Sequence, residues 1–311
     1  MQITGTEITF RSAGVTCAGR LYRRPDGPTP MPGVVLVHGV SGVMDRLDVQ
    51  AAGLASYGMA ALVFDYRGFG RSAGEPRQVL DLPAQRADLR AAVDWLRAHD
   101  DVDPGRVALW GNSLGGAYAI SEAADDPAIA AVVSQIPFNG FPRRVEGRST
   151  GDSLRLLGAI LEDVLRGRLG RRPAYIPMIG RPGQVAVVAT GDARRHLRTL
   201  TGQADIGDAG QRVGTWRNEI APRGLLQMMR YRPEEDAARL RVPLLVCVAA
   251  DDREAPPEAG VRLAERAPYG QVLRYPGRHF DFYADPDTQR RVAADQGMFL
   301  RTQLASKSDA G

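Results

Sequence analysis

The sequence predicts an α/β protein with a mostly parallel central sheet, helices on both faces and a helical, lid-like insertion. Short apolar runs of strand length alternate along the chain with segments of helical periodicity. These runs are continuously apolar, as expected for parallel strands buried on both faces. The alternation stops after residue 137 and resumes near residue 241. We therefore expect a core of residues 1–137 and 241–305, an insertion (lid or cap) at 138–240, and a flexible tail at 306–311.

The predicted elements follow in order along the chain. Residues 3–10 and 15–23 have the pattern of a starting pair of strands. Further strands are expected at 33–37, 60–64, 106–110, 129–133, 243–248 and 271–275. Apolar residues at three- and four-residue spacing predict a helix over 82–99 between two of these strands. Within the insertion, shorter helical segments are expected at 153–165 and 223–231.

Composition excludes several classes of protein. The 311 residues are 44% hydrophobic and 24% charged, which is ordinary for a globular chain and unlike a disordered one. Two cysteines, Cys17 and Cys247, are too few for a disulfide framework or a thiolate zinc site. The first ten residues lack the pattern of a signal peptide, and no apolar run approaches the ~18 residues of a membrane helix. We expect a soluble, cytoplasmic protein without metal or cofactor.

The net charge of +4 is concentrated in the insertion. Residues 138–240 contain 18 Arg against 11 Asp plus Glu, a net of +7. Solvated helix faces explain this excess most simply, and attraction of an anionic substrate or carrier is the alternative. No basic motif with interleaved aromatic residues appears, so nucleic acid is not an expected partner.

The strongest chemical signal is a G-x-S-x-G pattern at residues 111–115. It follows an apolar strand and precedes a helical stretch, so its serine, Ser113, is expected at a sharp strand-to-helix turn. A side chain at Gly111 or Gly115 would crowd the crossing of the strand and the helix. We predict that Ser113 is a nucleophile with a strained backbone, above the carboxyl ends of the strands.

A serine hydroxyl needs a base, and the chain has four histidines. His38 ends a strand, His99 ends a surface helix among acidic residues, and His196 lies among arginines that disfavour an imidazolium. His279 follows the last predicted strand, where a loop could carry it over the serine. His279 is the predicted base.

The imidazole in turn needs a carboxylate to hold its tautomer and stabilise its charge. Asp251 and Asp252 both follow the strand at 243–248, and the chain order Ser, Asp, His is that of G-x-S-x-G hydrolases. We predict Asp252, with Asp251 as the alternative. Two backbone N–H groups should bind the oxyanion, those of Leu114 and of Val40 in the loop after the first parallel strand. His38 is then a structural residue that orders this loop.

Together these segments resemble the α/β-hydrolase superfamily. The resemblance is carried by the His38-Gly39 loop, Asp65–Ser72, Gly111–Gly116, Asp252 with the prolines that follow it, and Gly277–Asp281. It looks closest to the dienelactone-hydrolase-like and X-Pro-dipeptidyl-peptidase-like branch. It implies the α/β-hydrolase fold and a serine hydrolase without cofactor. The insertion matches no signature of this branch.

The expected reaction is cleavage of an ester or thioester through an acyl-enzyme, on a medium-sized hydrophobic acyl group. Apolar residues of the insertion are the candidates for binding it: Tyr175, Met178, Trp216 and Met228. A small core of the insertion's own explains most of them equally well. The alternatives are a peptidase, a C–C bond hydrolase, or non-hydrolytic acyl transfer or cyclisation. The expected partner is a small acyl substrate, free or bound to a carrier protein or coenzyme A, and a homodimer is a further hypothesis.

Overall fold

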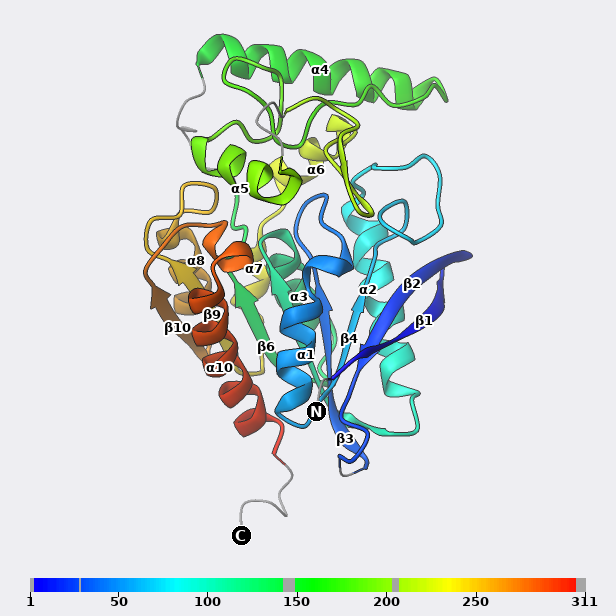
Figure 1. Cartoon of the computed structure of the whole chain (residues 1–311), viewed down its shortest axis with the longest axis vertical. Helices are drawn as coiled ribbons and strands as arrows, with labels where there is room; N and C mark the ends of the chain where they lie inside the picture. The colour runs from blue at the N-terminus through cyan, green and yellow to red at the C-terminus, as the bar shows by residue number, and fades with distance from the viewer. Residues whose placement is uncertain (1–2, 28, 142–148, 203–206, 306–311) are drawn as a thin grey trace.

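The computed structural model describes residues 3–27, 29–141, 149–202 and 207–305. Its centre is an eight-stranded sheet in the order β1-β2-β4-β3-β5-β6-β9-β10 (Figure 1). The strands are β1 (Gly5–Ser12), β2 (Val15–Tyr22), β3 (Met31–Val37), β4 (Ala60–Phe64), β5 (Val102–Asn112), β6 (Ile129–Gln135), β9 (Leu244–Ala249) and β10 (Gly270–Tyr275). β1, β2 and β4 pair antiparallel, and the pairs from β4 to β10 are parallel. The predicted fold class is confirmed.

The sheet separates two apolar cores, which is why its inner parallel strands are apolar at successive positions, whereas the edge strands β1 and β10 are largely exposed. In β3, Val35 and Val37 face one core, whereas Val34 and Leu36 face the other. All four side chains are fully buried. Alternate residues of a strand point to opposite faces, so a strand covered on both sides needs apolar residues at every position.

Helices cover both faces of the sheet. They are α1 (Asp48–Ser56), α2 (Leu82–Arg97), α3 (Leu114–Asp125), α8 (Pro257–Arg266), α9 (Asp281–Ala284) and α10 (Pro286–Gln303). α2, α3 and α8 pack in one core, and α1, α9 and α10 pack in the other. A short 3-10 helix, η1 (Met44–Arg46), lies between β3 and α1.

Most of the segment between β6 and β9 lies over the carboxyl end of the parallel strands, at the top of Figure 1, and its last helix packs beside α3 and α8. Its elements are α4 (Thr150–Arg168), α5 (Gly191–Thr201), β7 (Arg212–Val213), β8 (Trp216–Arg217), η2 (Pro222–Gly224), α6 (Leu225–Arg230) and α7 (Pro233–Ala237). α4 contains the helix predicted at 153–165 and extends it at both ends. η2 and α6 together correspond to the helix predicted at 223–231. α5 was not predicted.

This segment shares a core with the sheet. Ile176, Leu225 and Met228 belong to the same buried cluster as the residues of β5 and α3. A second cluster joins Val43, from the loop after β3, to Ile179 and Trp216. These apolar residues of the segment therefore pack against the core. The division at 138–240 stays a prediction, and the predicted tail at 306–311 lies outside the described residues.

None of the described helices is long and apolar enough to cross a membrane.

Candidate active site

Ser113 lies at the turn between β5 and α3, in a strained conformation. Its φ is +51° and its ψ is −120°, a combination of backbone angles that residues other than glycine rarely adopt. A Cβ on Gly111 would lie 2.2 Å from the carbonyl oxygen of Gly115, and one on Gly115 would lie 2.5 Å from that of Val37. Only glycine fits at both positions, so the two glycines allow the turn that presents the serine.

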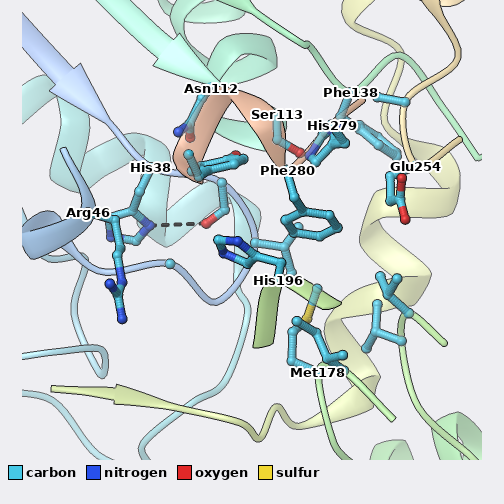
Figure 2. A pocket seen from close by; sticks show the side chains of 18 of the residues that line it. His38, Arg46, Asn112, Ser113, Phe138, Met178, His196, Glu254, His279 and Phe280 are labelled. Carbon is cyan, nitrogen blue, oxygen red and sulfur yellow. Dashed lines mark hydrogen bonds between the residues drawn. The ribbon is translucent and has the colours of Figure 1, made fainter. Parts of the chain in front are cut away.

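Asp252 and His279 meet in the loops that follow β9 and β10. The Nδ1 of His279 donates to Oδ2 of Asp252 at 2.7 Å, and both side chains are buried. The other oxygen of Asp252 accepts from the backbone N–H groups of Glu254 and Ala255, which fixes the carboxylate. Asp251, the alternative, is exposed and does not reach the ring. Figure 2 shows the side chain of Ser113 pointing toward His279.

The pKa of His279 reflects two opposing effects. Burial of the ring favours the neutral form and lowers the pKa, but the charge and hydrogen bond of Asp252 outweigh burial and raise it above the ordinary value. With Nδ1–H held by Asp252, Nε2 is the nitrogen free to accept a proton.

This raised pKa predicts the acid limb of the pH–rate profile. The base must be neutral to accept a proton, so kcat/KM should rise as the pH increases through the pKa of His279 in the free enzyme. We expect the midpoint above about 6.5, the usual imidazole value. The measurement is kcat/KM for a neutral ester between pH 5 and 9. A midpoint at or below the usual value would be inconsistent with the Asp252 contact.

Two backbone N–H groups are available for an oxyanion beside Ser113. Leu114 is the first residue of α3, and Val40 lies in the loop after β3. Neither N–H donates to an acceptor within the described part of the chain. A Cβ on Gly39 would lie 2.9 Å from the Cβ of Ser113, so the Val40 loop passes close to the serine because residue 39 is glycine.

His38 is buried and neutral. Its Nδ1 donates to the carbonyl oxygen of Gly39 at 3.0 Å, and its ring packs edge-on against Tyr66. Burial lowers the pKa of His38 to about 4. These contacts agree with a structural residue that orders the oxyanion loop.

A cavity opens at Ser113 between the sheet and the segment above it. Its apolar wall includes three of the four predicted substrate-binding residues, Met178, Trp216 and Met228. Tyr175 does not line this cavity; its hydroxyl donates to the backbone carbonyl of Arg77 instead.

Four ionisable residues that the sequence analysis did not select also line the cavity: Arg46, His196, Glu254 and Tyr283. The ring of His196 stacks on Phe280 with 4.7 Å between ring centroids. Burial, and then the charge of Arg46, lower the pKa of His196 to about 4, so it is neutral. The sequence signal that could have placed His196 at the cavity is its three-residue spacing from Ala193, which is buried on the same side of α5.

No group of three or more His, Cys, Asp or Glu side chains among the described residues could hold a metal ion. The arrangement is suited to attack by a hydroxyl on a carbonyl carbon, because the side chain of Ser113 points toward His279 and the ring of His279 is bonded to Asp252.

Comparison with known proteins shows the family of the chain. Residues 28–287 match the family described as "Serine aminopeptidase, S33". The quorum-quenching protein AidA of Acinetobacter baumannii is 35% identical over 95% of this chain and 94% of its own length. The thiohydrolase aneE of Aspergillus aculeatus is 31% identical over 58% of this chain and 57% of its own length. The structure of DcsB in complex with its substrate analogue superposes with a TM-score of 0.80 at 22% identity, covering 97% of this chain and all of that one.

Proposed function

The chain belongs to the serine aminopeptidase (S33) family of α/β-hydrolases and is an enzyme, and on this premise we propose that it cleaves an ester or thioester through an acyl-enzyme. Ser113 is the nucleophile, His279 the general base and Asp252 its partner. The resemblance to the dienelactone-hydrolase-like and X-Pro-dipeptidyl-peptidase-like branch stays a prediction within this superfamily.

The proposed reaction has two halves. As Oγ of Ser113 attacks the carbonyl carbon, its proton passes to Nε2 of His279, and the N–H groups of Val40 and Leu114 bind the oxyanion. The intermediate collapses when His279 gives this proton to the leaving alcohol or thiol. Water then attacks the acyl-enzyme by the same route, with His279 as base, and releases the acid and the free serine.

One observation carries the proposal. The 2.7 Å contact between His279 and Asp252 lies beside a serine that the fold holds in a strained turn, at a cavity with an apolar wall. A buried imidazole–carboxylate pair has no structural need for a neighbouring serine, whereas nucleophilic catalysis requires one. The apolar wall, together with the similarity to a thiohydrolase, supports a hydrophobic acyl ester or thioester as substrate.

The test is a panel of p-nitrophenyl esters and N-acetylcysteamine thioesters of increasing acyl length, with aminoacyl p-nitroanilides as the peptidase alternative. We expect saturable hydrolysis of esters or thioesters, with a burst of p-nitrophenol from p-nitrophenyl esters whose deacylation is slower than acylation. Turnover of the anilides alone would favour the peptidase instead.

Delivery of the acyl group on a carrier protein or coenzyme A is the finer proposal, supported by the net charge of +7 over residues 138–240. Hydrolysis of a carrier-bound thioester should fall steeply as salt increases from 50 to 500 mM, because salt screens attraction between separated charges. The same acyl group on uncharged N-acetylcysteamine is the control and should respond little. Equal salt sensitivity of the two substrates would argue against a charged carrier.

The homodimer also stays a proposal. The surface suited to it is a row of exposed leucines on one side of α4: Leu154, Leu157, Leu161 and Leu165, between 41% and 64% exposed.

A further inference from the structure

Arg46 is a cation without a counterion in the wall of the catalytic cavity. It is the last residue of η1, a few residues after the oxyanion loop, and it is partly buried. No residue that the structure describes forms a hydrogen bond or ion pair with its guanidinium. Figure 2 shows Arg46 at one side of the cavity, with His196 between it and Phe280.

The neighbouring carboxylate, Asp45, is bound by other groups. Its Oδ1 accepts from Arg20 at 3.2 Å and pairs with Arg71 at 3.4 Å, and its Oδ2 accepts from the hydroxyl of Thr215 at 2.8 Å. The charge of Asp45 is therefore shared by two other arginines and does not pair with Arg46.

Two other partly buried arginines of the molecule have a carboxylate partner, whereas the guanidinium of Arg77 is bound by the backbone carbonyls of Gly70 and Ser72. Arg67 pairs with Asp88, and Arg223 pairs with Asp163 at 2.7 Å. Arg46 has no such hydrogen-bonded partner: burial lowers the pKa of its guanidinium, and the charge of the nearby Asp45 offsets this only in part. Taking a cation out of water costs free energy unless an anion or a set of acceptors replaces the water. At a cavity wall, a ligand can supply that anion.

The surroundings of Arg46 favour an anionic group over a neutral one. His196 is neutral, so it provides no counterion for the guanidinium. Glu254 lies on the far side of the cavity in Figure 2, where one of its oxygens accepts from the hydroxyl of Thr190. The negative charge of the cavity wall is thus distant from Arg46.

We propose that Arg46 binds a carboxylate carried by the acyl part of the substrate. The guanidinium presents a planar fork of N–H donors that matches a carboxylate. The leaving group must lie against His279, which protonates it, and Arg46 lies on the other side of Ser113 (Figure 2). A group that reaches Arg46 therefore belongs to the acyl part. This inference rests on the proposed function and specifies its substrate as an acyl group with an apolar body and an anionic end.

The test compares two p-nitrophenyl esters of equal acyl length, the neutral hexanoate and the anionic adipate monoester, in wild type and R46Q. We expect wild type to favour the adipate. In R46Q, kcat/KM for the adipate should fall about 10- to 100-fold, mainly through KM, because hydrogen bonds to a charged group are lost. In R46Q, kcat/KM for the hexanoate should fall much less. The ratio of kcat/KM for the adipate to that for the hexanoate therefore measures the loss of anion binding.

Matched variants separate binding from folding. R46K keeps the charge but not the fork, and should recover part of the preference. R212Q removes the same charge from the exposed Arg212 of β7, away from the cavity, and should keep both activities. Equal losses on both esters in R46Q, or no preference for adipate in wild type, would show that Arg46 supports the loop rather than binding an anion.

Two further measurements complete the design. A loss in R46Q with hexanoyl-coenzyme A but not with hexanoyl-N-acetylcysteamine would place the anion in the leaving group and overturn the assignment to the acyl part. Calorimetric binding of adipate to wild type, weakened in R46Q, tests the subsite even if no ester is cleaved. Failure of ester cleavage with adipate binding intact would count against the proposed function and not against this subsite.

Discussion

Replacing Ser113 with alanine is expected to lower kcat on an ester substrate by about 10⁴- to 10⁶-fold, since residues of such a triad act as a unit. The backbone turn depends on the flanking glycines and not on the hydroxyl, so S113A should fold normally. The measurement is steady-state hydrolysis of a p-nitrophenyl ester, with circular dichroism to verify folding. S153A, which removes a hydroxyl from an exposed residue of α4, is the matched control and should retain wild-type activity.

A residual kcat in S113A within about tenfold of wild type would remove Ser113 from the mechanism, because removal of a catalytic nucleophile lowers kcat by far more than this. A large loss in S153A as well would indicate damage to the fold and not to the chemistry.

The second large effect is expected at Asp252. D252N should lower kcat about 10⁴-fold, because the amide no longer holds Nδ1–H of His279 in the productive tautomer. D251N makes the same substitution at the adjacent residue, but Asp251 is exposed and has no contact with the ring of His279. It should keep kcat within about twofold, in line with surface substitutions elsewhere.

The comparison between these two variants decides the alternative that the sequence left open. Steady-state kinetics of both, with the same ester, is sufficient. A larger loss in D251N than in D252N would reverse the assignment, and equal losses would point to a disturbed loop.

Local sequence patterns were enough to predict the fold. The inner parallel strands β3, β4, β6 and β9 are buried on both faces, so their apolar runs appear in the sequence without knowledge of their neighbours, and β4 was predicted to the residue. Ser113 was selected from the G-x-S-x-G pattern between a strand and a helix. Asp252 and His279 were selected because each follows a strand end, and parallel strands bring their carboxyl ends to one edge.

The cavity wall depends instead on how distant segments pack, which no local pattern encodes. Arg46 lies in a single turn of 3-10 helix, and His196 in α5 was judged by the arginines beside it in sequence. In the structure its neighbour is Phe280, more than eighty residues away. Tyr175 was chosen for its apolar ring, but its hydroxyl is bound at the backbone of Arg77, outside the cavity.

The central claim is that Ser113 is a nucleophile activated by His279. A fluorophosphonate probe reacts covalently with such a serine, and mass spectrometry of the digested adduct locates it. We predict one adduct per chain, on the peptide that contains Ser113, with labelling abolished at low pH and in His279→Ala. An adduct on another residue, or none in protein that hydrolyses p-nitrophenyl esters, would contradict the account.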